Sequence, residues 1–212
     1  MKKIILILLI YFTQFINLSS DEPKLEEIIK GLKNPWSLSF INNEEILVTE
    51  RSGNLLKINF INKKIDKFTH NLNILEDGQG GLLEVLFNNK EIFVSYAEDR
   101  GNGKSSTSVA KALLKNNKLN FKNIFRAEPP INSGYHFGSR LVIKNDYLFI
   151  TAGERGQGMI AQDATKHPGS IIRINIDGSV PKNNPKFEDK KNWLPEIYQI
   201  GVRNPQGMAL SP

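Results

Sequence analysis

A histidine and a glutamate at the two ends of one apolar run could together carry proton-transfer chemistry. His136 lies in the stretch YHFGSRL, just before an apolar segment that extends to Ile150, and Glu154 lies in the polar turn TAGERG that follows it. An imidazole can take up a proton near neutral pH, and a carboxylate can orient the ring and stabilise the imidazolium. The pair is a candidate general base with its orienting partner; the alternative for His136 alone is a structural histidine.

Two further polar loops also precede apolar segments. Gln79 lies in DGQGG, where its amide could bind a planar ligand. Arg203 and Asn204 lie in VRNPQG, where the guanidinium offers two parallel donors to a carboxylate and the amide adds a donor and an acceptor. In isolation, the Gln79 loop is better explained as a tight turn, and Arg203 as a solvated surface side chain.

The elements that must position these residues are short strands separated by turns, which indicates an antiparallel meander. The segments ILVTERSG, IFVSYAEDRG and LFITAGERG begin at Ile46, Ile92 and Leu148, which are 46 and 56 residues apart. Repeats of about 40–50 residues with four strands each are typical of propeller blades. The sequence therefore predicts an all-β propeller. A β-sandwich is the second choice, because it would not readily repeat the same strand and loop.

The propeller fold predicts that the polar loops meet. The innermost strands of a propeller line a central channel, and the loops that lead into them share one face. We therefore expect the candidate ligand-facing residues to converge at one mouth of the channel, although they lie far apart in sequence. They are Gln79, His136, Arg203 and Asn204.

The two ends of the chain carry their own signals. Residues 207–210 (GMAL) are expected to begin a fourth unit. Three blades and one strand cannot close a ring, so we expect an N-terminal portion of a longer protein; a half-propeller that pairs with another chain is the alternative. Lys2, Lys3 and the apolar run 4–10 predict a signal peptide over residues 1–20, with the propeller portion over 21–212. The mature protein would then be periplasmic or secreted, without a stable membrane anchor.

Composition limits other functions. The net charge of +6 is spread without long basic blocks, which argues against nucleic acid as a partner. There is no cysteine, so neither a disulfide nor a Cys-ligated zinc site can form. The NGKS of residues 102–105 lacks the first glycine of a phosphate-binding loop, since Glu98 takes that place. His70 and His167 lack a second ligand at metal-binding spacing, so no metal site is predicted within this chain.

Several motifs in register resemble the soluble PQQ-dependent aldose sugar dehydrogenases, the glucose/sorbosone dehydrogenase family. They run from about residue 32 to the end of the chain: GLKNPWSLSF, ILVTERSGNLLKI, DGQGGLLEV, HFGSRLV, ITAGERG, GSIIRINIDGSVPKNNP and IYQIGVRNPQGMAL. The resemblance implies a six-bladed β-propeller of which about the first three blades are present, with the chain ending in the fourth.

The resemblance also implies a reaction. An aldose would be oxidised at its anomeric carbon to a lactone, with the hydride passing to PQQ, and the reduced cofactor would give its electrons to an external electron acceptor. His136 would be the general base, and Glu154 its partner. Gln79, Arg203 and Asn204 match the family positions that contact PQQ, whose carboxyl groups need guanidinium and amide donors.

Three departures qualify this expectation. Glu154 is one methylene longer than the aspartate usual in the family, and Val202 replaces a histidine. The calcium ligands and the other basic cofactor contacts are expected beyond residue 212, so this chain alone is expected to be inactive. The alternative is a non-catalytic propeller that binds a protein or a glycan. A metal-dependent lactone hydrolase is a third reading, which the lack of paired inward carboxylates disfavours.

Overall fold

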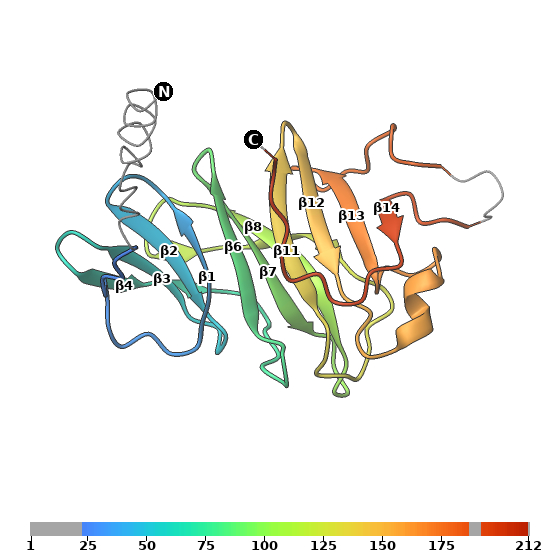
Figure 1. Cartoon of the computed structure of the whole chain (residues 1–212), viewed down its shortest axis with the longest axis horizontal. Helices are drawn as coiled ribbons and strands as arrows, with labels where there is room; N and C mark the ends of the chain where they lie inside the picture. Colours follow the sequence, from blue (N-terminus) through green and yellow to red (C-terminus); the bar gives the residue numbers. More distant parts are fainter. Residues whose placement is uncertain (1–22, 187–191, 212) are drawn as a thin grey trace, which may run out of the picture.

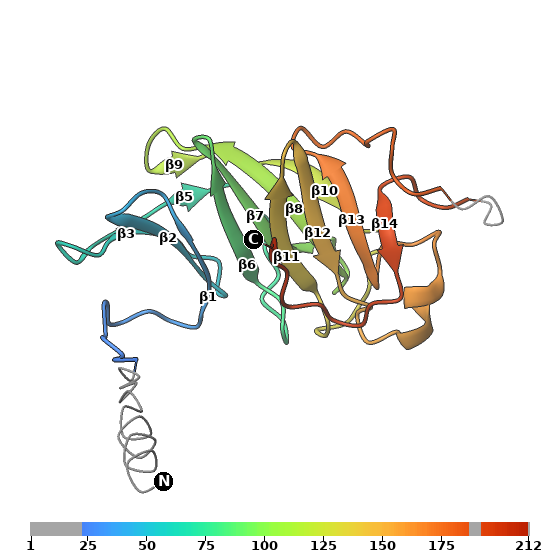
Figure 2. The ribbon, with the colours of Figure 1, turned by 45° about the horizontal axis from the view of Figure 1, so that its top comes forward.

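Three four-stranded antiparallel sheets stand side by side like the blades of a propeller (Figures 1 and 2). The computed structural model describes residues 23–186 and 192–211, so the predicted signal peptide lies outside the described residues. Each sheet follows the order of the chain, as expected for a meander. The predicted all-β propeller architecture is confirmed.

The strands have the following bounds. Blade 1 contains β1 (Pro35–Phe40), β2 (Glu45–Glu50), β3 (Leu55–Asn59) and β4 (Lys64–Lys67). Blade 2 contains β6 (Leu82–Asn88), β7 (Glu91–Asp99), β8 (Ser105–Leu113) and β10 (Lys122–Arg126). Blade 3 contains β11 (Gly138–Lys144), β12 (Tyr147–Ala152), β13 (Ser170–Asn175) and β14 (Ile197–Ile200). The short parallel strands β5 (Thr69–His70) and β9 (Lys118–Leu119) pair at the periphery, and a 3-10 helix, η1 (Gly158–Gln162), follows β12. No helix among the described residues is long and apolar enough to cross a membrane.

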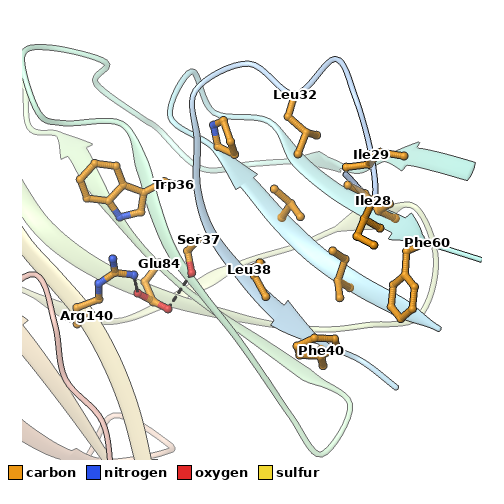
Figure 3. Close-up of a pocket in the computed structure, with 14 residues that line it drawn as sticks. Ile28, Ile29, Leu32, Trp36, Ser37, Leu38, Phe40, Phe60, Glu84 and Arg140 are labelled. Carbon is orange, nitrogen blue, oxygen red and sulfur yellow. Dashed lines mark hydrogen bonds and ion pairs between the residues drawn. The ribbon is translucent and has the colours of Figure 1, made fainter. Parts of the chain in front are cut away.

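The hydrophobic core lies between the blades. One cluster joins Leu47 of β2 to Leu82 and Val94 of blade 2, and a second joins Phe93 of β7 to Ile150 of β12. Both faces of blade 2 are therefore covered. The far face of blade 1 packs against Ile29 and Leu32 of the segment before β1. It leaves apolar side chains exposed at the pocket of Figure 3: Leu38 at 55% and Phe40 at 64%.

The innermost strands β1, β6 and β11 are joined by polar side chains at matching positions. Glu84 of β6 accepts a hydrogen bond of 2.8 Å from the hydroxyl of Ser37 in β1 and forms an ion pair with Arg140 in β11 (Figure 3). Arg140 also donates from Nε to the carbonyl of Gln206. These contacts place the first strands of the three blades next to one another, in chain order.

In each blade a buried hydroxyl of the second strand accepts a hydrogen bond from a backbone N–H at a β-bulge in the first strand. The pairing register shifts between the first and second strands of all three blades, at 35/37, 82/85 and 138/141. A bulge leaves a backbone group without its ladder partner. Here the N–H groups of the bulge are taken by side-chain oxygens, at 3.2, 3.0 and 2.8 Å: Ser37 by Thr49, Glu84 by Ser95, and Arg140 by Thr151.

The same three hydroxyls also donate outside their own blade: those of Thr49 and Ser95 to the next blade, and that of Thr151 to the segment after β14. The acceptors are carbonyl oxygens at 2.5, 2.6 and 2.8 Å: Leu83 for Thr49, Ser139 for Ser95, and Pro205 for Thr151. All three hydroxyl residues are at most 1% exposed. These contacts, named here the hydroxyl bridges, explain the Thr or Ser shared by the repeats ILVT, IFVS and LFIT.

The structure differs from the sequence prediction at residues 207–210, which form no strand. The third hydroxyl bridge ends on Pro205, the position that corresponds to Leu83 and Ser139 in the first strands of blades 2 and 3. A strand is defined by a ladder of backbone hydrogen bonds with a neighbour. Within the described part of the chain, residues 203–206 contact β11 and β12 through Arg140 and Thr151 side chains instead.

Removal of the first hydroxyl bridge should destabilise the protein. In Thr49→Val the shape is kept, but the N–H of Ser37 and the buried carbonyl of Leu83 lose a partner. We expect a loss of about 1–3 kcal/mol in the free energy of unfolding, measured by urea denaturation. Thr49→Ser is the matched control, since it keeps the hydroxyl; equal stability of the two variants would contradict the bridge.

Candidate functional site

The loops before β6 and β11 and the segment after β14 meet around the backbone of residues 136–138. Gln79 Oε1 accepts the N–H of His136 at 2.9 Å, and Asn204 Oδ1 accepts the N–H of Gly138 at 3.0 Å. Residues separated by 57 and 66 positions in the chain are thus joined directly. The geometric convergence expected from a propeller is present.

Glu154 connects the remaining predicted residues to this cluster. Its Oε1 hydrogen-bonds Nδ1 of His136, and its Oε2 accepts the N–H of Gly158 at 2.8 Å. Arg203 lies beside it, with its carbonyl accepting the N–H of Glu154 at 2.8 Å and its Nε 3.9 Å from Oε1. Gln79, His136, Glu154, Arg203 and Asn204 therefore form one contiguous site at the inner edge of blades 2 and 3.

The contact with Glu154 defines the form of the imidazole. A carboxylate only accepts hydrogen bonds, so Nδ1 carries the hydrogen and Nε2 keeps its lone pair in the neutral ring. No group among residues 23–186 and 192–211 hydrogen-bonds Nε2. The side chain of His136 is 16% exposed, whereas that of Glu154 is 4% exposed. The arrangement offers an accessible proton acceptor backed by a buried carboxylate.

The backbone of His136 is held in an unusual conformation. Its φ is +51°, in the left-handed region that residues with a side chain seldom adopt. The N–H is fixed by Gln79, and the carbonyl accepts the N–H of Arg155 at 3.3 Å. Gly153 is needed for this close approach, because a Cβ there would lie 2.1 Å from the carbonyl oxygen of His136.

Hydrogen bonding keeps Glu154 ionised. Burial of the carboxylate acts to raise its pKa. The hydrogen bonds from His136 and from the N–H of Gly158 together outweigh burial, so the pKa of Glu154 lies below its ordinary value of 4.5. An ionised Glu154 can stabilise positive charge on the imidazole of His136.

Three groups at the site retain donors for an anionic ligand. Gln79 and Asn204 use their amide oxygens on the loop backbone, and in the described chain their amide nitrogens have no hydrogen-bond partner. The side chain of Arg203 is 81% exposed. Guanidinium and amide donors suit carboxylates and carbonyl oxygens. Residues 23–186 and 192–211 contain no group of three or more His, Asp or Glu side chains that could hold a metal ion.

Sequence reasoning missed the contribution of Arg155. Each of the three repeats ends in a loop with an acidic residue and an arginine, an acid-and-arginine loop, and Arg155 is that arginine in the third repeat. In the structure Arg155 is 2% exposed and donates to the carbonyls of Ser133 and Tyr135, directly before His136. The one sequence feature that could have indicated a role for Arg155 at the site is its position next to Glu154.

The fold and the site define a class: a β-propeller whose inner loops present a histidine–carboxylate pair beside donors for an anion. The profile of the Glucose / Sorbosone dehydrogenase family matches residues 32–212. The chain belongs to this family.

Individual relatives agree with the family assignment. The "Aldose sugar dehydrogenase YliI" of Escherichia coli (strain K12) is 34% identical over 89% of this chain and 53% of its own length. A solved structure named "glucose dehydrogenase" matches with a TM-score of 0.84 at 36% identity, over 90% of this chain and 62% of that one. The PQQ-bound form of Aldose Sugar Dehydrogenase from Streptomyces coelicolor matches with a TM-score of 0.73 at 22% identity, over 86% and 55%, which shows the shared fold. The chain spans about half the length of the curated relatives it matches over most of its own length.

The lowered pKa of Glu154 predicts acid-dependent stability. A carboxyl whose pKa is lower in the folded protein stabilises it above the unfolded pKa, and this contribution is lost as the pH falls through the folded value. We therefore expect Glu154→Gln to reduce the free energy of unfolding at pH 7, and the difference from wild type to shrink below about pH 4.5.

Urea denaturation between pH 7 and pH 3 would measure this difference. Glu154→Asp, which keeps a titrating carboxylate, is the control and should retain part of the pH dependence. A difference between wild type and Glu154→Gln that stays constant over this range would rule out Glu154 as the group responsible.

Proposed function

We propose that this protein takes part in the PQQ-dependent oxidation of an aldose at its anomeric carbon to the lactone, with His136 as general base. The observation that carries the proposal is the free Nε2 of His136, backed by ionised Glu154 and placed beside the unused donors of Gln79, Arg203 and Asn204. The relatives include an aldose sugar dehydrogenase and a glucose dehydrogenase, which supports the same reaction class.

The donor set fits PQQ. The amide nitrogens of Gln79 and Asn204 and the exposed guanidinium of Arg203 would hold its carboxylate and carbonyl oxygens. When bound, PQQ supplies the quinone that accepts the hydrogen and electron pair from the anomeric carbon. Calcium belongs to the proposal through the family resemblance, with ligands expected beyond residue 212.

The residues of this chain have defined tasks in the proposed reaction. His136 Nε2 takes the proton of the anomeric hydroxyl as the C–H bond breaks. The imidazolium that forms keeps its Nδ1–H on Glu154, whose negative charge offsets the new positive charge. Gln79 holds the backbone of His136, so the ring stays in place during proton transfer.

The proposed setting rests on the signal peptide predicted over residues 1–20. A secreted or periplasmic protein would meet free aldoses outside the cytoplasm and pass electrons to a separate acceptor. Because the chain spans about half of its curated relatives, the activity is proposed for the protein in its full natural length.

Substitution of His136 tests the proposal. In the full-length protein reconstituted with PQQ and calcium, we expect His136→Asn to lower kcat for aldose-dependent dye reduction about 10²–10⁴-fold, the usual contribution of a general base. His70→Asn is the matched control, since His70 bonds the carbonyl of Gly53 in blade 1 and contacts no site residue. Its kcat should remain at the wild-type level.

Two outcomes would contradict the proposal. An unchanged kcat in His136→Asn would remove His136 from the base role. A wild-type protein that binds PQQ but oxidises no aldose would favour the alternative, a non-catalytic propeller that binds a protein or a glycan.

A further inference from the structure

Arg155 is a buried cation without a carboxylate partner in the described chain. It is 2% exposed, and none of the ion pairs among residues 23–186 and 192–211 includes it. Burial lowers the pKa of its guanidinium to about 10, although the charge of Asp77 acts to raise it. A buried charge is costly unless hydrogen bonds satisfy it. The acceptors of those hydrogen bonds show which segments of the chain Arg155 connects.

The guanidinium links blade 2 to the loop that carries His136. Nε donates to the carbonyl of Tyr135 at 2.9 Å, and Nη2 donates to the carbonyl of Ser133. On the other side, Nη1 and Nη2 donate to the carbonyl and the hydroxyl of Ser105, the first residue of β8, at 2.8 and 2.9 Å. One planar group thus bonds two segments that come from different blades.

The contacts of Arg155 lie on both sides of His136. Tyr135 precedes it, and Phe137 follows it with its ring centroid 3.7 Å from the guanidinium carbon. The backbone N–H of Arg155 bonds the carbonyl of His136 itself. The neighbouring Glu154 bonds the imidazole ring. Two consecutive residues therefore hold the backbone and the ring of the same histidine.

We propose that Arg155 is a positioning residue for His136. Its guanidinium fixes residues 133–137 against β8, which keeps His136 in its left-handed conformation and its imidazole on Glu154. The side chain is 2% exposed and four of its five N–H donors are used within the protein, so we assign it to positioning and not to the binding of substrate or cofactor. The consequence for catalysis rests on the proposed function, whereas the positioning is a property of the free protein.

Only a planar guanidinium with several N–H donors can make all the contacts of Arg155 at once. Lysine would keep the charge, but its compact ammonium cannot stack on Phe137 and reach Tyr135, Ser133 and Ser105 at once. Arg155→Lys is therefore the informative variant, because it separates the geometry of the side chain from its charge.

The ring signals of His136 allow a direct measurement, because their loss in His136→Asn identifies them among the histidines of the labelled protein, as the loss in His70→Asn identifies those of His70. In full-length protein labelled with ¹⁵N-histidine and free of cofactor, we expect Arg155→Lys to shift and broaden the ring signals of His136 and to leave those of His70 unchanged. In the reconstituted protein the same variant should lower kcat by up to about 10²-fold, as for a catalytic group displaced by about 1 Å, with a smaller change in KM.

Two further variants keep the test decisive. Arg173→Lys is the matched control, since the Arg173 guanidinium lies on Tyr147 and Tyr198 and contacts no site residue; its His136 signals should match those of wild type. Ser105→Ala removes a single acceptor and should shift the His136 signals in the same direction by a smaller amount, even if Arg155→Lys fails to fold.

The outcomes separate this inference from the proposed function. Wild-type His136 signals in both folded Arg155→Lys and Ser105→Ala would overturn the positioning role. If Ser105→Ala alone folds, its signals decide the question. If the signals shift as expected but the wild-type protein oxidises no aldose, the proposed function fails and the positioning role stands.

Discussion

The buried hydroxyl bridges are the interactions on which the arrangement of the blades depends. Each of Thr49, Ser95 and Thr151 accepts a backbone N–H at a bulge in its own blade. Thr49 and Ser95 donate to a carbonyl of the next blade, and Thr151 donates to the segment after β14. Apolar packing between blades is strong but has little directional preference. A buried hydroxyl that accepts from a backbone group of one blade and donates to a carbonyl of another segment requires a narrow range of lengths and angles, so the bridges set the register between blades.

The candidate site depends on this register because no single blade contains it. His136 precedes blade 3, Gln79 precedes blade 2, and Asn204 follows the last strand of blade 3. The bridges on Ser139 and Pro205 lie within one or two residues of the hydrogen bonds that hold Gly138 and Asn204. A displacement of one blade relative to the next would therefore change the position of the His136 imidazole. Arg155 adds a second constraint, from β8 to the same loop.

Much of the fold and of the candidate site could be predicted from the sequence, because each repeat in the sequence forms one blade of the structure. The strands β2, β7 and β12 were predicted from the apolar runs that lead into acid-and-arginine loops, and the polar loops before β6 and β11 were predicted to share one face. The strand β8 was missed. Its first half, Ser105 to Ser108, is polar and buried, since its groups bond Arg155, Glu98 and the carbonyl of Phe137, so it lacks the apolar alternation that marks a strand.

The fold class and the family could be predicted from residue types and their spacing, and the same spacing predicts the residues of the candidate site. How these residues contact one another is visible only in the folded protein: Gln79 and Asn204 use their amide oxygens on the loop of His136, and Glu154 meets Nδ1 and leaves Nε2 free. The role of Arg155 and the absence of a strand at residues 207–210 were also decided there. The physical reason is that such contacts join segments from different blades, and no local pattern in a chain encodes the distance between two side chains that only folding brings together.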